Sequence, residues 1–115
     1  MRLTVLTLAV LASLTACGGG SDDGAANKVF KSLGSRQCSG GGVSLAVLQA
    51  ELAAANVQVA SAACGTTGQA LPTVCGGTDG KIGIFEISPT QAGAAAAAGF
   101  APLNTEPSAK IVPCT

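Results

Sequence analysis

Hydrophobic and polar positions recur with two different periods along this chain, and each period predicts a different kind of element. One region has leucines at a helical spacing, namely Leu45, Leu48 and Leu52. This spacing predicts an amphipathic helix over residues 45–55, with Ser44 as a favourable N-cap and Asn56 as a residue that can end it. The segment KIGIFEI at 81–87 is a short β-branched apolar run instead, and it predicts the clearest strand of the chain.

A second, alanine-rich helix is predicted nearer the C-terminus. Ser88 can cap it, Pro89 suits the first helical position, and Gln91 stands three residues after the cap, as in a capping box. Alanine is the best helix former, so we expect the helix body over 92–98 and its end at Gly99. A low-complexity tether is the alternative interpretation of this alanine run.

Four further segments favour extended structure. They are the later half of 28–38, then 57–63, 101–104 and 110–112. The order strand, helix, strand, strand, helix, strand, followed by the short last segment 110–112, predicts an α+β domain with two helices on one face of a mainly antiparallel sheet. A split β-α-β unit repeated twice is the ferredoxin-like βαββαβ arrangement. We therefore expect a two-layer sandwich of this kind, pinned by two disulfides.

The first residues of the chain follow a third pattern. After the charged Arg2, an apolar run extends over 3–14 and ends shortly before Cys17. It is too short for a membrane-spanning helix, which needs about 20 apolar residues. The pattern is typical of a secretory signal peptide. Residues 1–16 are therefore predicted to be removed and to take no part in the fold.

The segment Leu14-Thr15-Ala16-Cys17 resembles the lipobox of bacterial lipoproteins, in which an aliphatic and two small residues precede a cysteine. The resemblance implies that a diacylglycerol is attached to the sulfur of Cys17, that the signal is cleaved before this residue, and that the new amine is acylated. Two or more acyl chains hold a protein at a membrane where a single chain does not. We therefore expect a lipid-anchored protein of the bacterial cell envelope.

The residues after the lipobox refine this expectation. In Gram-negative bacteria an Asp directly after the lipidated cysteine tends to retain a lipoprotein in the inner membrane, whereas Gly18 stands there in this chain. We expect the protein to be located at the outer membrane, facing the periplasm. Asp22 and Asp23 keep the inner membrane as an alternative location. The lipidated cysteine and the small and polar residues after it, 17–27, are typical of a flexible tether. The folded domain is then 28–115.

The four remaining cysteines, an even number in a small exported domain, predict two disulfides. We expect Cys64–Cys75 to close a local loop and Cys38–Cys114 to tie the C-terminal tail to an early strand. The main alternative joins Cys38 to Cys64 and Cys75 to Cys114. The spacing of the cysteines does not decide between these two pairings. The absence of a C-x-x-C pair argues against a structural zinc site and against a thioredoxin-like motif.

Composition narrows the function classes. The chain carries six basic and six acidic residues, with a formal net charge of zero, so no basic surface for nucleic acid is predicted. Histidine is absent, which removes histidine metal ligands and the Ser–His and Cys–His nucleophile pairs. We expect no catalytic residue, metal or cofactor. A histidine-free serine hydrolase, using Lys81 or Lys110 as the base, is a remote alternative.

Three surface features are candidates for binding. The glycines of CSGGGVS, 38–44, precede a predicted helix, where backbone N–H groups and the helix dipole could hold an anion. A plain strand-to-helix turn is the favoured interpretation. Arg36 and Gln37 could form an interaction edge or a solvated strand face. Glu86 is expected to face solvent on the open face of the sheet rather than to act as a general acid or base.

These features together favour a non-catalytic interaction module with a protein partner in the envelope, because the edge strands of an open sheet can accept a partner strand. The alternative is a small-ligand or peptide-binding lipoprotein that uses the groove near the glycine-rich turn and the loop 65–80.

Overall fold

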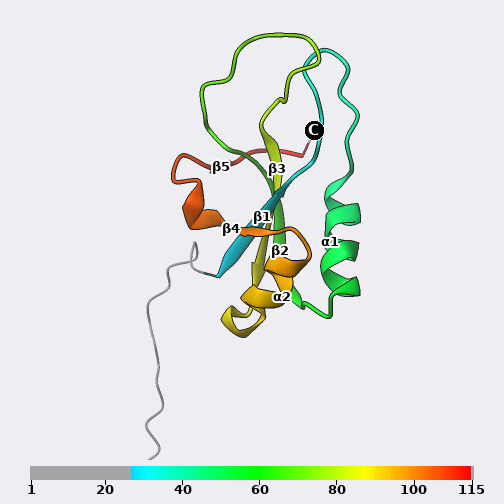
Figure 1. Ribbon diagram of the computed structural model, residues 1–115, viewed down its shortest axis with the longest axis vertical. Coiled ribbons are helices and arrows are strands. Elements are labelled where there is room, and N and C mark those ends of the chain that lie inside the picture. Colours follow the sequence, from blue (N-terminus) through cyan, green and yellow to red (C-terminus); the bar gives the residue numbers. More distant parts are fainter. Residues whose placement is uncertain (1–26, 115) are drawn as a thin grey trace, which may run out of the picture.

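The computed structural model describes residues 27–114, and within that range the chain folds into an α+β domain (Figure 1). Its strands are β1 (Lys28–Ser32), β2 (Val59–Thr66), β3 (Lys81–Ile87), β4 (Ala101–Pro102) and β5 (Lys110–Ile111). Its helices are α1 (Leu45–Ala54) and α2 (Ala92–Ala97), with 3-10 turns η1 (Pro89–Gln91) and η2 (Leu103–Thr105). The predicted signal peptide, the lipobox with Cys17 and most of the tether lie outside the described residues.

The strands of residues 27–114 form one five-stranded sheet in the order β4-β1-β3-β2-β5. Every neighbouring pair is antiparallel, and β3 lies at the centre between β1 and β2. At the outer side of β2, the short β5 pairs Ile111 with Gly65 and Lys110 with Thr66. This fifth strand extends the sheet beyond the four strands of the predicted βαββαβ arrangement.

The main core lies between the sheet and the two α-helices of the described residues. It joins side chains of β1, α1, β3 and α2 with two residues of the connections, namely Val29, Leu48, Leu52, Val57, Phe85, Ile87, Ala95 and Phe100. The rings of Phe85 and Phe100 meet edge to face, with centroids 5.7 Å apart. Because residues of both helices belong to this one cluster, α1 and α2 cover the same face of the sheet, as predicted.

The opposite face of the sheet carries a second apolar layer. Ile82 and Ile84 are buried there, outside the main core. Since β4 and β5 lie at opposite edges, the chain between them must cross the sheet, and Figure 1 shows this segment on the side away from α1. A Cβ placed on Gly65 would meet both Ile84 and the carbonyl of Lys110. We call residues 103–112 the C-terminal strap, because they cover this face.

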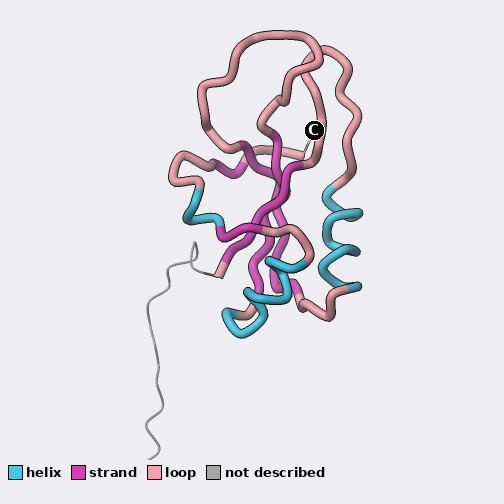
Figure 2. The backbone as a smooth tube through the Cα atoms, viewed as in Figure 1, coloured by secondary structure: helices cyan, strands magenta, loops and turns pink. Residues whose placement is uncertain are grey.

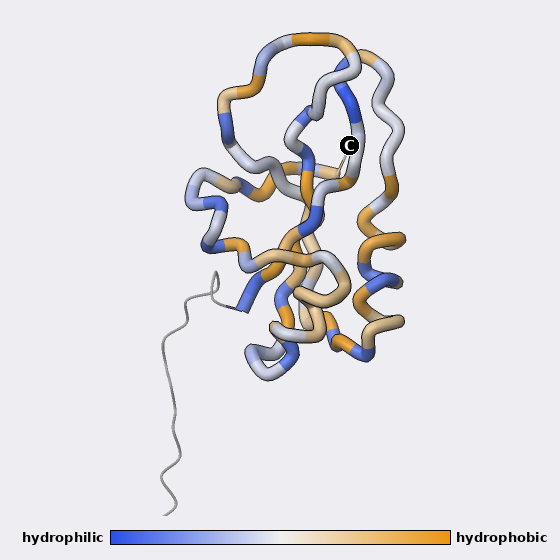
Figure 3. Tube along the Cα trace, in the orientation of Figure 1, coloured by the Kyte–Doolittle hydropathy of each residue, from blue (hydrophilic) through white to orange (hydrophobic). Residues whose placement is uncertain are grey.

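The first helix agrees closely with its prediction. The hydroxyl of Ser44 accepts a hydrogen bond from the N–H of Val47, and Asn56 has a left-handed φ of 61° after the helix end. Leu48 and Leu52 are buried, as the leucine spacing indicates. The outward side is nonetheless apolar as well, because Val47 is 46% exposed and several alanines lie beside it. Figure 3 shows hydrophobic positions on more than one side of this helix.

The second helix begins differently from its prediction. Ser88 makes no capping hydrogen bond, and residues 89–91 form a 3-10 turn before α2 starts. The predicted capping box is wrong because the amide of Gln91 has other partners: it accepts from the N–H of Gln58 and donates to the carbonyl of Asn56. Gln91 thus fastens α2 to the turn between α1 and β2. The predicted helix end is confirmed by the φ of 93° at Gly99.

The first strand is also placed differently. It occupies Lys28–Ser32, the earlier half of the predicted segment rather than the later half. The pairing of Val29 with Phe85 explains this, because it buries an apolar residue against the core. Apart from Leu33 and Cys38, the later half offers a sheet only a glycine and polar side chains. It forms a turn with bridges from Arg36 to Gly40 and to Thr78 instead.

Two disulfides are present, but their predicted pairing is wrong. The structure joins Cys38 to Cys75 and Cys64 to Cys114, with Cα atoms 5.1 Å apart in each pair. The pairing of β5 with β2 brings Cys114 to Cys64, because the N–H of Val112 donates to the carbonyl of Cys64. This leaves Cys38 and Cys75 to join two long loops, which extend beyond the strands at the end of the domain away from α2 (Figure 2).

Candidate functional site

The outer edge of β2 is only partly paired. Within residues 27–114, β5 pairs with Gly65 and Thr66, and no strand pairs with this edge between Val59 and Ala63. The residues Ala60, Ser61 and Ala62 are exposed. Unpaired backbone groups on a strand edge are a template for another strand. We call the stretch Val59–Ala63 the β2 edge.

The hydrogen bonds at the end of β2 show which backbone groups face outward. The N–H of Thr67 donates to the carbonyl of Gly80, toward β3, whereas the carbonyl of Cys64 accepts from Val112 on the opposite side. Backbone groups of an antiparallel strand alternate between its two sides. The N–H and C=O of Ala62 therefore point away from β3, into the space beside the β2 edge.

Side chains do little to block this edge. The segment from Val59 to Ala63 reads VASAA and contains no charged residue and no proline, which are two common protections of natural edge strands. A bulge between Val59 and Ser61 is one protection that β2 does have. Beyond that bulge, the hydroxyl of Ser61 donates to Glu86 at 3.0 Å and keeps this carboxylate over the sheet. The edge is therefore open from Ser61 to Ala63.

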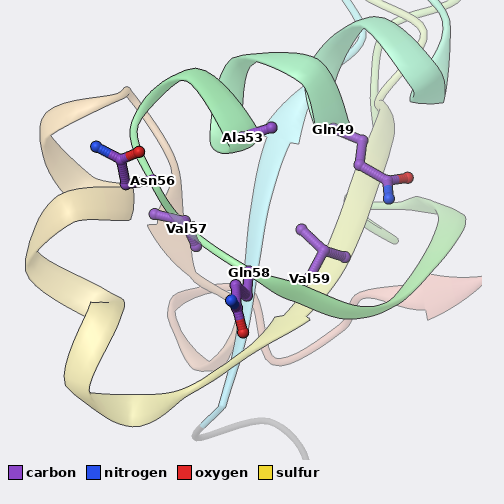
Figure 4. A pocket seen from close by; sticks show the side chains of 6 residues that line it. All are labelled: Gln49, Ala53, Asn56, Val57, Gln58 and Val59. Atoms are coloured by element: carbon purple, nitrogen blue, oxygen red, sulfur yellow. The ribbon is translucent and has the colours of Figure 1, made fainter.

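A hollow of about 620 Å³ borders the β2 edge (Figure 4). It is lined by residues of α1, of the following turn and of the start of β2, namely Gln49, Ala53, Asn56, Val57, Gln58 and Val59. In Figure 4, Gln49 and Ala53 come from α1, while Val59 lies on β2 below them. A side chain projecting from a strand added at the β2 edge could enter this hollow. Sequence reasoning missed the site because its unpaired stretch depends on how far β5 extends.

The predicted interaction edge at Arg36 and Gln37 lies elsewhere, in the two loops joined by Cys38–Cys75. The side-chain amide of Gln37 donates to the carbonyls of Pro72 and Thr78 and accepts from the N–H of Val74. The guanidinium of Arg36 donates to the carbonyl of Gly76. Both residues bind the loops to each other, and a role in binding a partner stays a prediction.

A second hollow, of about 400 Å³, lies at the N-terminus of α1. The glycine-rich turn and the first residues of α1 form one wall, and Ser35, Asp79 and Lys81 form another. Burial alone would raise the pKa of Asp79. The Ser35 hydroxyl, the N–H of Lys81 and the charge of Lys81 outweigh burial and lower this pKa below its ordinary value. Asp79 is therefore ionised at neutral pH.

Glu86 and the lysines considered as bases lie apart from one another in the sheet. Glu86 and Lys81 are at opposite ends of β3, and Lys110 is on β5. Among the hydrogen bonds of the described residues, none joins a serine hydroxyl to Lys81 or Lys110. Ser61 meets Glu86 instead. The contact of Ser61 with Glu86 joins β2 to β3.

No protein-family model matches this chain, and neither a curated protein nor a solved structure matches it. In the part of the chain that the structure describes, neither α-helix is long and apolar enough to cross a membrane.

Proposed function

We propose that this protein is a lipid-anchored module of the bacterial cell envelope that binds a protein partner through the β2 edge and carries out no catalysis. The observation that carries the proposal is the outward-facing backbone of Ala62, with exposed, uncharged small residues beside it. An extended segment of a partner can pair with such an edge through main-chain hydrogen bonds. One side chain of the partner segment can enter the neighbouring hollow, and this contact adds specificity.

The anchor half of the proposal rests on the lipobox resemblance. Attachment of lipid at Cys17 and cleavage of 1–16 would leave about ten tether residues before β1. A glycine- and serine-rich tether of that length spans roughly 16–19 Å on average. This is enough to hold the domain just off the lipid headgroups, and we place it at the outer membrane, facing the periplasm.

We also propose that the domain is a ferredoxin-like βαββαβ sandwich with one strand added. The neighbour order β4-β1-β3-β2 supports this, with α1 between β1 and β2 and α2 between β3 and β4 along the chain. In this view β5 is an addition at the β2 side. Because β5 is short, it leaves the β2 edge unpaired, and the proposed partner pairs with this edge.

The proposed edge is tested in cells that make the full chain with a photo-cross-linking residue at position 60. Ala62→Pro removes an N–H that points away from β3, so the pairing of β2 with β3 is kept. Ala62→Ser is the matched control, since it changes the side chain and retains the N–H. We expect one discrete cross-linked envelope protein, lost in Ala62→Pro and kept in Ala62→Ser.

A cross-linker at the exposed Ala94 of α2 should give no such product. A product that persists in Ala62→Pro would contradict the edge as the binding site, and so would the absence of a product at position 60. The anchor is tested separately by labelling cells with a fatty acid that carries a detectable tag. Label is expected on the natural chain and not on Cys17→Ser, and label retained by Cys17→Ser would overturn the anchor.

A further inference from the structure

We propose that the Cys38–Cys75 disulfide is a thiol–disulfide exchange site that accepts electrons from an external dithiol, whereas Cys64–Cys114 is structural. The site lies in the loops beyond the strands, apart from the β2 edge, and does not depend on the proposed function (Figure 2). Both of its cysteines are exposed, and neither belongs to a helix or strand. Exposed or strained disulfides are the more easily reduced ones in proteins.

The backbone holds Cys38 in an unfavourable conformation. Its φ is 71°, in the left-handed region that residues other than glycine, Asn and Asp rarely occupy. The turn around it is closed, because Arg36 and Gly40 exchange hydrogen bonds between their N–H and carbonyl groups. This turn therefore carries Cys38 near its tip, in contact with solvent rather than with the core.

Arg36 lies beside the other cysteine of the pair. Its guanidinium donates to the carbonyl of Gly76 at 2.9 Å, and Gly76 directly follows Cys75. A neighbouring positive charge favours the thiolate form of a cysteine, and a more stable thiolate leaves faster. The incoming thiolate is therefore directed at the sulfur of Cys38, with Cys75 as the leaving group.

The exchange proceeds in two steps. A thiolate of the dithiol attacks the Sγ of Cys38, the S–S bond breaks, and Cys75 leaves as a thiolate that takes a proton from water. The second thiolate of the dithiol then attacks the dithiol's other sulfur within the mixed disulfide and releases Cys38, which is also protonated. Two electrons pass to the chain: the dithiol becomes a disulfide, and Cys38 and Cys75 become thiols.

Hydrogen bonds keep the two loops together when the S–S bond is open. The N–H of Gln37 donates to the carbonyl of Gly77, and the carbonyl of Gln37 accepts from the N–H of Gly76. The side-chain amide of Gln37 adds three bonds to the same loop. The thiols of Cys38 and Cys75 therefore stay near each other, and the disulfide can form again without refolding of the domain.

The other disulfide resists the same attack from either side. Cys64 is only 6% exposed, so its sulfur is hard for a thiolate to reach. Cys114 is exposed, but attack there would expel Cys64 as a thiolate within the sheet, where burial opposes the charge. Reduction would also remove the covalent link just beyond the C-terminal strap. The two disulfides of this chain should therefore differ in their exchange with thiols.

The test is partial reduction of the full chain with dithiothreitol, an external dithiol, at neutral pH without denaturant. Free thiols are alkylated at successive times, and mass spectrometry of the peptides locates the label. We expect complete labelling of Cys38 and Cys75 before label appears on Cys64 and Cys114. Equal rates, or earlier labelling of Cys64 and Cys114, would overturn the proposal. In concentrated urea all four cysteines should react alike, and a difference that persists there would contradict its origin in the fold.

The role of Arg36 is tested by two variants in the same experiment. Arg36→Gln should slow the reduction of Cys38–Cys75 by about two- to fivefold at low salt, the effect of one exposed charge. Arg36→Lys is the control that keeps the charge, and it should slow reduction less. If Arg36 only held the loops together, its loss would speed reduction instead, and that result would overturn the assigned direction of attack.

The role of Gln37 is tested in the opposite reaction, the formation of Cys38–Cys75 from the reduced chain with oxidised glutathione. Gln37→Ala removes the three side-chain bonds between the loops, so the disulfide should form more slowly. Gln91→Ala is the matched control, because Gln91 binds the turn after α1 and should leave the rate unchanged. An unchanged rate in Gln37→Ala would contradict the reversible site.

Discussion

The two faces of the sheet are covered in different ways. On one face, α1 and α2 place a continuous set of apolar side chains against Phe85, which is fully buried. On the other, Ile82 and Ile84 are covered by the C-terminal strap, whose only regular elements are η2 and the two-residue strand β5. The helical face is thus held by packing of regular elements. The strap face is held by the two paired residues of β5 and by a covalent bond just beyond the strap, since Cys114 is joined to Cys64 of β2.

This contrast predicts where the domain is most sensitive to a single change. Phe85→Ala on the helical face removes a buried ring that also meets Phe100, and it should cost about 3–5 kcal/mol of the free energy of unfolding. Urea denaturation of 28–115 with intact disulfides measures this loss. The conservative control, Phe85→Leu, should cost clearly less, and equal losses in the two variants would contradict the close packing of this ring.

The strap face is tested by removing its disulfide. Cys64→Ser with Cys114→Ser should lower the free energy of unfolding by about 2–5 kcal/mol, and the strap should separate from the sheet while the helical core stays folded. Hydrogen exchange checks this through the N–H of Val112, which donates to the carbonyl of Cys64.

The matched control is the other disulfide. Cys38→Ser with Cys75→Ser loosens the two loops but leaves the strap attached, so the N–H of Val112 should keep its protection from exchange. If the two double variants expose this N–H equally, the two disulfides do not have the separate roles inferred from their positions.

A smaller effect is expected for the polar contact at the border of the helical face. The ammonium group of Lys31 pairs with Glu51 of α1 at 2.6 Å and lies 5.2 Å from the centre of the Phe100 ring. Both charged side chains are about one-third exposed, so Lys31→Met should cost at most about 1 kcal/mol. Thermal unfolding at low and high salt measures it. A loss that does not shrink with added salt would show that packing, and not charge, dominates.

The smallest effect concerns the loops outside both faces. The pKa of Asp79 is lowered in the folded chain, so its carboxylate stabilises the fold above the ordinary value of 3.8, and this contribution is lost as the pH falls through the lower folded pKa. Asp79→Asn should lower stability slightly near pH 7, where the carboxylate contributes, and flatten the decline over that acidic window, so that the two chains converge at low pH. An unchanged decline between pH 4 and pH 2 would contradict the assignment.

Local patterns predicted the elements well where the residues that determine them are neighbours. The cap at Ser44, the leucine spacing of α1, the strand at 81–87 and the turn at Gly99 all follow from short-range sequence. The predictions failed where a distant segment supplied the partner. Gln91 bonds to the turn after α1 instead of capping its own helix, and Val29 joins the sheet because Phe85 lies opposite it.

The candidate sites show the same limit. The glycine-rich turn before α1 was predicted as a possible anion site from its sequence alone, but Ser35 and Asp79 of its hollow were not. Ser35 lies in the segment that was predicted to be extended, and Asp79 precedes Gly80, a pair that is typical of a local turn. Their proximity follows from the bonds that join the two loops, such as that from the N–H of Asp79 to the carbonyl of Ser35.

The sequence by itself determined the α+β class, both helices, the central strand, the number of disulfides and the expectation of a lipid anchor at Cys17, since each depends on spacing or composition within a short segment. Only the tertiary structure decided the disulfide partners, the strap over Ile82 and Ile84, and the open β2 edge. These depend on where β5 meets β2. A two-residue strand has too little local preference of its own to predict that meeting, and it forms only because the rest of the sheet offers it an edge.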